Sequence, residues 1–397
     1  TPGADVTHIT YANANDAENI QTINLTAEEK AAGKYTLAGL QPTSTYTITI
    51  YKNDVKRGQL QITTPAAMPA ANYKYSLSSD VTVISQTLID EIAEQAKAAA
   101  GNETNYSATI GIPAGAKVAL YGTNDTDGGK TNVTIPDGMS VTFFGLAGGE
   151  TPTITLDKNF DVAGSHAFIK FQNVKLEENG AGYFINQSKA CTVGEFTLED
   201  CEVSNIKTSF FRFQGSDAKS VGKLTLKNSI FTNLCAGYGF IHIDAKNGAG
   251  HLDNVEIDGC TFNSICVTGK VFIYSNKKDM QDITIKNSTF YNCNGNGQYF
   301  VDFGKDAKFG PNTFTIESCI FGKSADEKTD KNIRSKTPAT VANSFRTTDF
   351  FKVIKGVIDT EFSSEQLFTD PANGNFTIKA GTLKEKAGDP RWYVVED

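Results

Sequence analysis

A repeat of about 28 residues restricts the fold of this chain more than any other feature. Six strand-like segments line up, and they begin 27, 28, 31, 28 and 31 residues apart. Each segment has apolar residues at its first and third positions and a polar or charged residue at its fourth, which is the alternation of a half-buried strand. The segments are IKFQNVKL from Ile169, FTLEDCEV from Phe196, LTLKNSIF from Leu224, VEIDGCTF from Val255, ITIKNSTF from Ile283 and FTIESCIF from Phe314. VTFFGLAG from Val141 fits one period earlier, and VALYG from Val118 is expected to start the series.

The period and the absence of helices between the strands exclude most other repeat folds. A βαβ unit needs a helix in each repeat, a leucine-rich repeat is shorter, and the signature of a propeller blade is missing. The sequence therefore predicts an all-β fold, a right-handed parallel β-helix over residues 77–397. A helix over about residues 86–100 is expected to cap its open end, beginning after Ser85 and stopping at Gly101. Its apolar face is expected to consist of Leu88, Ile92, Ala96 and Ala99.

The repeat also predicts where each coil bends and where its thiols lie. A column of residues that tolerate a left-handed backbone follows each strand, so we expect a bend there. The column contains Asn173, Asp200, Asn228, Gly259, Asn287 and Ser318. Cys201, Cys260 and Cys319 come next and stand two coils apart, about 9–10 Å, so we expect buried free thiols rather than disulfides. Cys235 and Cys266 lie on adjacent coils, and the sequence leaves open whether they form a disulfide.

Composition and charge argue against nucleic acid as a partner and against a transmembrane segment. The 37 basic and 45 acidic residues give a net charge of −8, and the basic residues are spread along the sequence, so nucleic acid is not an expected partner. No run of about 18 apolar residues is present, so we expect no transmembrane segment. The first residues, TPGADVTHIT, match neither a signal peptide nor a lipid-attachment motif, and any export signal is expected to be absent from this sequence.

The first 65 residues differ from the repeat. LAGLQPTSTYTITIY places Leu40, Pro42, Ser44 and Tyr46 at alternate positions before a strand, and this spacing resembles a fibronectin type III domain near its tyrosine corner. A complete domain of that family has about 90–100 residues, so residues 1–65 are expected to form a partial domain, with two strands missing before Thr1. Residues 66–76, which include PAAMPAAN, are the expected linker.

The C-terminal part carries two further strings with a family resemblance. They are DPANGNF at Asp370–Phe376 and GDPRW at Gly388–Trp392. With the partial fibronectin-like module, the capping helix and the coils, they resemble the secreted pectate-lyase-like β-helix proteins of the DUF4957 and DUF5123 families. The resemblance implies an exported protein, lipid-anchored at the cell surface or extracellular, that serves the use of polysaccharide, often pectic. It implies no catalytic residues, because none are established for these families.

A second strand in each coil places a row of polar side chains on the outer face. The triplets FIN, FFR, FIH, FIY and FVD have an apolar, inward-facing middle residue, so the third residue faces outward. The outward residues are Asn186, Arg212, His242, Tyr274 and Asp302, joined two positions later by Gln214, Asp244 and Asn276. The phenylalanines that begin the triplets (184, 210, 240, 272 and 300) are expected to stack inside the corner of the coil.

These eight outward residues are the candidate carbohydrate-binding residues, and we call them the strip. Arg212 suits a uronate carboxylate, Tyr274 suits a pyranose ring, and His242 suits proton transfer. Solvation of an outward column also accounts for polar residues there. The leading hypothesis is a surface protein that binds polysaccharide or oligosaccharide, an acidic plant glycan, along the strip. The alternatives are a polysaccharide lyase with Arg212 or His242 as the base, and a noncatalytic scaffold that binds the proteins of a glycan-uptake assembly.

Signatures of hydrolases and metal sites are weak in this sequence. No paired carboxylates occupy the same strand position in neighbouring coils, as a glycoside hydrolase needs. Asp244 and Asp302 lie two coils apart, too far to share one calcium ion. TNDTDGG at Thr123–Gly129 resembles a calcium loop, although an Asp-Gly turn explains the string as well. No metal ligand is therefore assigned, and the sequence leaves open whether the protein binds calcium. RSK, Arg334–Lys336, matches one part of the polygalacturonase pattern by itself. His8, His166 and His251 are expected to have no partners.

Overall fold

The computed structural model describes residues 5–64, 66–124, 126–328, 331–383 and 386–393, and the chain divides into two compact units. The N-terminal unit covers residues 1–68 and the β-helix unit covers residues 69–397. Each unit has a hydrophobic core of its own, and the core of the β-helix unit is by far the longer.

The N-terminal unit is a four-stranded antiparallel sheet with the order β2-β1-β3-β4. Its strands are β1 (His8–Asn13), β2 (Asp16–Asn24), β3 (Thr45–Lys52) and β4 (Val55–Thr63), and helix α1 (Ala27–Ala32) follows β2. At the start of β3, the hydroxyl of the buried Tyr46 accepts a hydrogen bond of 2.9 Å from the backbone N–H of Gln41.

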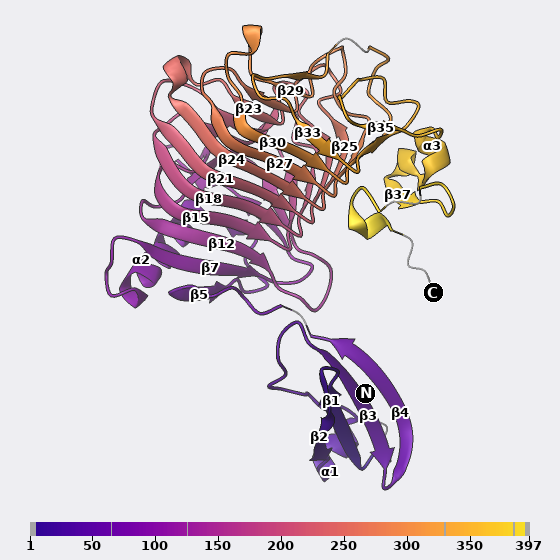
Figure 1. The fold of residues 1–397 in the computed structure, drawn as a ribbon. Helices are drawn as coiled ribbons and strands as arrows, with labels where there is room; N and C mark the ends of the chain where they lie inside the picture. Colours follow the sequence, from indigo (N-terminus) through magenta and orange to yellow (C-terminus); the bar gives the residue numbers. More distant parts are fainter. Residues whose placement is uncertain (1–4, 65, 125, 329–330, 384–385, 394–397) are drawn as a thin grey trace. The chain divides into compact units, whose positions relative to one another are not determined.

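The β-helix unit winds through three parallel sheets, as the repeat predicts (Figure 1). The ten-stranded sheet contains β5 (Tyr73–Ser76), β7 (Tyr106–Ile112), β12 (Met139–Gly145), β15 (Gly164–Gln172), β18 (Cys191–Glu199), β21 (Lys219–Lys227), β24 (Gly250–Asp258), β27 (Met280–Lys286), β30 (Pro311–Glu317) and β33 (Thr340–Ala342). The eleven-stranded sheet contains β6 (Val83–Ile84), β8 (Lys117–Leu120), β13 (Thr153–Leu156), β16 (Lys175–Glu178), β19 (Glu202–Ser204), β22 (Ile230–Leu234), β25 (Thr261–Ile265), β28 (Thr289–Tyr291), β31 (Ile320–Phe321), β34 (Phe345–Arg346) and β35 (Ile358–Asp359). The eight-stranded sheet contains β11 (Val133–Thr134), β14 (Phe160–Asp161), β17 (Tyr183–Gln187), β20 (Ser209–Phe213), β23 (Ile241–Ile243), β26 (Ile273–Ser275), β29 (Val301–Asp302) and β32 (Ile333–Arg334).

The predicted register of the ten-stranded sheet is confirmed, but its predicted start is wrong. The first apolar column pairs coil by coil from Val141 through Ile169 to Phe314. Val118, in contrast, lies in β8 of the eleven-stranded sheet and pairs with Ile154. Both sheets present alternating apolar residues, so the pattern alone did not separate them. The ten-stranded sheet begins instead with β5 and β7, and β5 lies within the stretch expected to be a linker.

The bends and the internal aromatic stacks also follow the sequence pattern. The bend residues have positive φ, for example 54° at Asn173, 46° at Asn228 and 45° at Asn287. The triplet phenylalanines point into the core, and the rings of Phe240 and Phe272 stack with a centroid distance of 4.9 Å and an interplanar angle of 1°. All seven cysteines are buried free thiols, Cys235 and Cys266 included.

A helix covers the first coils, and the predicted cap is confirmed with a shifted face. Helix α2 (Gln86–Ala99) begins after Ser85, whose hydroxyl accepts a hydrogen bond from the N–H of Leu88. Ile89, Ile92, Ala93 and Ala96 are its buried residues, whereas Ala99 is exposed. The prediction placed Ala99 on the apolar face because alanine is compatible with either side of a helix.

The C-terminal residues form a clip on the outside of the eleven-stranded sheet. The clip contains α3 (Ser364–Leu367) and the antiparallel pair β36 (Phe368–Asp370) and β37 (Asn375–Ile378), with the single turns η3 (Pro371–Asn373) and η4 (Pro390–Trp392). Its apolar side chains form a second core with residues of the last coils, among them Tyr291, Ile320 and Phe345. Two further single turns, η1 (Lys246–Gly248) and η2 (Lys305–Ala307), and a small hairpin, β9 (Gly122–Thr123) and β10 (Lys130–Thr131), complete the unit.

Candidate functional site

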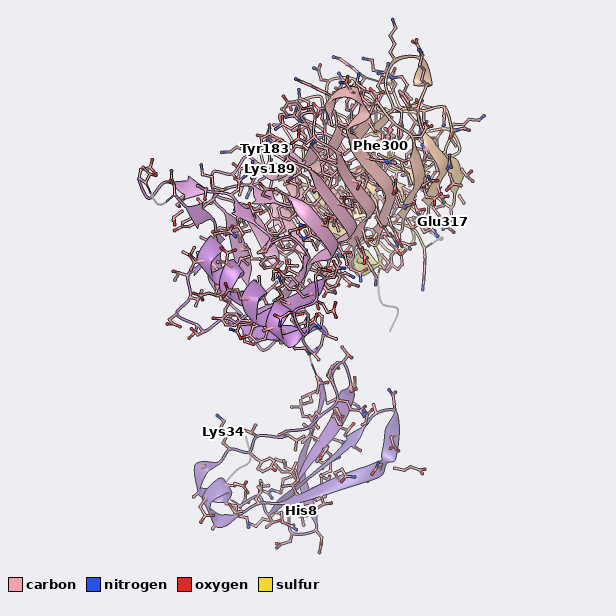
Figure 2. All side chains as sticks on the ribbon, turned by 90° about the vertical axis from the view of Figure 1, so that its left-hand side faces the viewer. His8, Lys34, Tyr183, Lys189, Phe300 and Glu317 are labelled. Atoms are coloured by element: carbon pink, nitrogen blue, oxygen red, sulfur yellow. The ribbon has the colours of Figure 1, made fainter. Side chains whose placement is uncertain are left out.

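The eight-stranded sheet places the third residues of the triplets in one continuous column. Asn186 pairs with Arg212, Arg212 with His242, His242 with Tyr274, and Tyr274 with Asp302. The column continues one coil further to Arg334. Figure 2 views the β-helix unit with Tyr183, Lys189 and Phe300 labelled, which lie in or next to strands of this sheet.

Arg212 and Asp244 form the best-defined pair of the strip. Arg212 Nε and Nη2 donate to the two carboxylate oxygens of Asp244 at 3.2 and 2.7 Å, and the guanidinium lies 3.7 Å from the ring centroid of Tyr238. Burial acts to lower the pKa of Arg212, but the hydrogen bond and charge of Asp244 outweigh it and raise that pKa. Arg212 is only 8% exposed, so its fork is occupied by Asp244 and is not presented to solvent.

His242 is held between a backbone N–H and the same carboxylate. Its Nδ1 accepts a hydrogen bond of 3.3 Å from the N–H of Gly239, and its Nε2 lies 3.6 Å from Asp244 Oδ2. Burial acts to raise the pKa of Asp244, but hydrogen bonds from His242 and Arg212 lower it to about 2. Since Nδ1 accepts the hydrogen bond of the Gly239 N–H and Nε2 faces the Asp244 carboxylate, neither nitrogen offers a free lone pair to a substrate.

Tyr274 carries the aromatic surface to the next coil. Its ring stacks on His242 with a centroid distance of 4.6 Å and an interplanar angle of 18°. Asn276 Nδ2 donates to the Tyr274 hydroxyl at 2.5 Å. Tyr274 therefore keeps a fixed orientation while remaining partly exposed, which suits a stacking platform.

Asp302 and Arg334 close the column with a second two-pronged pair. Arg334 Nε and Nη2 each lie 2.7 Å from a carboxylate oxygen of Asp302. The guanidinium of Arg334 lies 4.4 Å from the ring centroid of Tyr299. The arginine of the RSK string thus belongs to the strip column and not to a hydrolase motif. The strand of Arg334, β32, lacks the triplet pattern. However, Arg334 follows Asp302 by 32 residues, the same spacing as from His242 to Tyr274, and this spacing could have indicated its place in the column.

Three tyrosines that the sequence analysis did not assign lie beside the strip. Tyr183, Tyr238 and Tyr299 stand one or two residues before the triplet phenylalanines. The rings of Tyr183 and Tyr238 stack at 6.4 Å, and Tyr238 lies 5.1 Å from His242. A row of rings from Tyr183 through Tyr238 and His242 to Tyr274 therefore runs across the coils. Strand alternation did not indicate these tyrosines, because Tyr183 is the first residue of its strand and the other two lie in turns.

The strip also contains carbonyl oxygens without a hydrogen bond. Among the residues that the structure describes, Asn186 Oδ1 and Asn276 Oδ1 are buried acceptors without a partner. Leaving a buried acceptor unpaired costs about 1–3 kcal/mol, so an ordered water or a hydroxyl donor near these oxygens is favourable. Gln214, also partly buried, is fixed through its backbone N–H, which donates to Gln187 O.

The other histidines have partners, which corrects the expectation that they lack them. His8 stacks on Tyr51 at 4.7 Å. His166 is buried, with its ring nitrogens 2.7 and 3.0 Å from two backbone carbonyl oxygens. His251 Nε2 lies 2.8 Å from Asp253 Oδ1 on the ten-stranded sheet. These contacts give the three histidines structural roles.

A metal site is not evident in the described part of the chain. No group of three or more His, Cys, Asp or Glu side chains is placed there to hold a metal ion. In the loop that resembles a calcium site, Asp125 lies outside the described residues, and Asp127 Oδ1 accepts a hydrogen bond of 2.9 Å from the N–H of Gly129. Within the same described ranges, no helix has the length and apolar character needed to span a bilayer.

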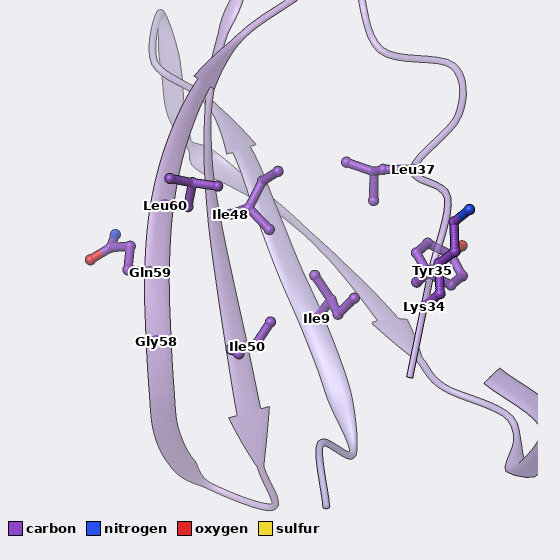
Figure 3. Close-up of a pocket in the computed structure, with 9 residues that line it drawn as sticks. All are labelled: Ile9, Lys34, Tyr35, Leu37, Ile48, Ile50, Gly58, Gln59 and Leu60. Carbon is purple, nitrogen blue, oxygen red and sulfur yellow. The ribbon is translucent and has the colours of Figure 1, made fainter. Parts of the chain in front are cut away.

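The N-terminal unit has an open apolar hollow on one side of its sheet (Figure 3). Its volume is about 490 Å³, and three strands supply the apolar lining side chains Ile9, Ile48, Ile50 and Leu60. Leu60 is 62% exposed. The hollow is an uncovered part of the sheet's apolar face, and its lining contains no carboxylate or histidine side chain.

The GDPRW string fastens the clip to the coils. Asp389 accepts hydrogen bonds of 2.7 Å from Thr261 Oγ1 and from Arg391 Nε. Trp392 Nε1 donates to the same Thr261 hydroxyl at 2.7 Å, and its ring meets Phe376 of the DPANGNF string edge to face at 5.7 Å. The two strings that carry the family resemblance therefore have a structural role, away from the strip.

Comparison with known proteins bears on this C-terminal region. Neither the curated proteins nor the solved structures gave a match to the chain. One family model does match, over the last coils and the clip. Residues 283–392 match DUF5123, a domain of unknown function.

Proposed function

We propose that the β-helix unit binds polysaccharide along the face formed by the strip and the neighbouring tyrosines. The observation that carries this proposal is the row of partly exposed rings from Tyr183 through Tyr238 and His242 to Tyr274. Sugar rings present apolar C–H faces that pack against aromatic faces. Successive coils lie about 4.8 Å apart, so a long ligand lying parallel to the β-helix axis meets a new polar or aromatic side chain at each coil.

The charged pairs fix the surface between the rings. Arg212 is locked to Asp244, and Arg334 is locked to Asp302. The partly exposed carboxylate of Asp244, held in this way, still has free lone pairs for sugar hydroxyls. Fixed side chains lose little conformational entropy when a ligand binds, which favours a preformed platform.

The same geometry disfavours the lyase alternative. A base must lose its proton near neutral pH, but the ion pair with Asp244 raises the pKa of Arg212. Both nitrogens of His242 are engaged by Gly239 and Asp244. Binding without bond cleavage is therefore the function that this arrangement supports best.

The cellular setting belongs to the same proposal and rests on the family resemblance. We place the protein outside the cell or anchored at its surface, related to DUF4957 as well as DUF5123 proteins. A fibronectin type III-like character of the N-terminal unit is supported by the bond between Tyr46 and Gln41, since a tyrosine hydroxyl bonded to a nearby upstream backbone group is typical of the tyrosine corner.

Affinity electrophoresis against plant and host glycans, with and without calcium, tests the binding proposal. The variant Tyr238→Ala/Tyr274→Ala is expected to lose the retardation shown by the wild type. Tyr121→Ala is the matched control, because Tyr121 is also a partly exposed ring under a cation but lies away from the strip. Equal retardation of the wild type and the double variant contradicts the proposal. Ultraviolet absorbance from unsaturated uronate products would instead support the lyase.

A further inference from the structure

Lysines in three successive turns gather along one edge of the strip. Each turn follows a strand of the eight-stranded sheet, and the turns span residues 244–249, 276–279 and 303–310. We call their exposed lysines the lysine ridge: Lys246, Lys277, Lys278, Lys305 and Lys308. Two of the turns contain the short helical turns η1 and η2, which project from the upper edge of the β-helix unit in Figure 1. Basic residues that look scattered along the sequence are thus brought together by the stacking of coils.

The strands that lead into these turns pair in register, β23 with β26 and β26 with β29, so the turns are stacked. The N–H of Lys246 donates to Gly215 O of the preceding turn at 2.7 Å. The N–H of Gly310 donates to Asp279 Oδ1 at 3.0 Å, which joins the second turn to the third. The ridge therefore runs coil by coil, parallel to the strip, at a spacing of about 4.8 Å.

The ridge lysines are unpaired, unlike many lysines elsewhere on the coils. Lys227 meets Glu199 at 2.8 Å and Lys286 meets Glu317 at 3.3 Å, each one coil away. Across the described residues, none of the five ridge ammonium groups has an ion pair or a hydrogen bond. Two nearby acids are already occupied, Asp244 by Arg212 and Asp279 by Lys336.

The charge of the ridge contrasts with that of the whole chain. In these turns and the preceding turn, the five lysines are accompanied by only two aspartates that are in no ion pair within the described ranges. They are Asp306, in the third of these turns, and Asp217, in the turn that precedes the first. The local excess of positive charge thus lies on a chain with a net charge of −8. An overall negative protein repels polyanions in general, so a positive edge favours an anionic ligand that is held at that edge.

We propose that the lysine ridge gives the strip its selectivity for acidic polysaccharide, a chain with a carboxylate on each sugar. This inference rests on the proposed function, because the rings of the strip hold the sugar backbone. Lys277 follows Tyr274 by three residues, so its exposed, flexible side chain starts at the edge of the strip close to that ring. The ridge supplies the cations that Arg212 and Arg334 do not, since both guanidinium groups are already paired.

An acidic glycan fits these observations better than a nucleic acid. Exposed rings and hydrogen-bonding side chains accompany the cations on this face, whereas the net charge of −8 opposes a phosphate polymer with a higher charge density. A single-stranded oligonucleotide therefore serves as the competing ligand in the test.

The test compares polygalacturonate with its fully methyl-esterified form, which keeps the backbone and removes the charge. The ridge variant changes Lys246, Lys277, Lys278, Lys305 and Lys308 to Gln. The matched control changes five exposed lysines away from the ridge, Lys97, Lys158, Lys323, Lys355 and Lys386, to Gln, with the same change in net charge. Thermal melting confirms that both variants are folded.

The wild type and the control are expected to bind polygalacturonate more tightly than its ester, with an affinity that falls as salt is added. The ridge variant is expected to lose about tenfold or more in affinity for polygalacturonate while binding the ester as the wild type does. Equal binding of acid and ester by the wild type overturns the ridge inference and leaves the proposed function intact. Binding of neither form, or tighter binding of the oligonucleotide than of polygalacturonate, also overturns the ridge inference, whereas the proposed function fails only if no glycan of the electrophoresis panel retards the wild type.

Discussion

Arg212 and Asp244, which project from neighbouring coils, form a two-pronged ion pair with N–O distances of 3.2 and 2.7 Å. The sequence predicts that both side chains contact a ligand directly. In the structure they bind each other and so form part of the fixed surface on which a ligand would lie. Asp244 is partly buried and also meets His242, so its charge depends on both partners. The strip is therefore a prearranged platform rather than a set of free charges.

The variant Asp244→Asn tests the contribution of this carboxylate to stability. The pKa of Asp244 is about 2 in the folded protein, below its ordinary value of 3.8. A lowered pKa stabilises the fold above the ordinary value, and this contribution is lost as pH falls from about 4 to about 2. Asp244→Asn should lower the free energy of unfolding by roughly 2 kcal/mol at neutral pH. Its Tm should also fall less than that of the wild type between about pH 4 and pH 2. Asp253→Asn, at a partly exposed pair, serves as control, and identical pH profiles for the wild type and Asp244→Asn contradict the prediction.

Removal of one ring from the internal aromatic stack should be costly. Phe240 is fully buried and stacks on Phe210 at 4.7 Å and on Phe272 at 4.9 Å. Phe240→Ala should lower the free energy of unfolding by about 3–5 kcal/mol, because it removes buried area and leaves a cavity. Phe168→Ala, at a partly exposed ring, should cost much less. Denaturant unfolding measures both, and similar losses would show that the stack is not the main support of these coils.

The contact between Asp389 and Thr261 predicts a local effect on the clip. Asp389→Ala leaves the Thr261 hydroxyl and Arg391 without their partner, at a cost of about 1–3 kcal/mol. Hydrogen exchange in β36 and β37 should accelerate by about tenfold or more, while exchange in β20 and β23 stays unchanged. Asp370→Ala, at an exposed site of the same clip, is the control. Global acceleration, or none, contradicts a fastening role for the GDPRW string.

The thiols should be unreactive in the folded protein. Burial raises the pKa of Cys201, Cys293 and Cys319 to about 12 and that of Cys191 to about 11. Thiolates, rather than thiols, react with maleimides, so labelling at neutral pH should be negligible until the protein is unfolded. Mass spectrometry after unfolding should then show seven labels, the number of cysteines in the chain. Five labels would reveal a disulfide, with Cys235 and Cys266 as the expected pair.

The periodic part of the fold was predictable because coil stacking repeats the same environment. The column from Ile169 to Phe314 is apolar in every coil, and the bend residues take positive φ for the reason that their residue types suggest. Val118 was assigned to the wrong sheet because two sheets share the same alternation.

The candidate site was predictable only as a column of positions. Coil lengths vary, so the sequence did not show that Asp244 reaches back to Arg212 or that Arg334 joins Asp302. Tyr238 and Tyr299 lie in turns, where alternation carries no information. The ridge lysines are up to 62 residues apart in sequence and become neighbours only through the stacked turns.

The four histidines of the chain allow a direct test of where the ligand binds. His242 lies in the strip, whereas His8 is in the N-terminal unit, His166 is buried, and His251 is on the ten-stranded sheet. Selective ¹³C labelling of histidine, with His242→Gln to assign the signal, would follow all four during titration with an oligogalacturonate. The account predicts that the His242 resonance shifts with saturation while the other three stay in place. Saturable binding that leaves His242 unchanged, or that shifts His251 instead, would contradict it.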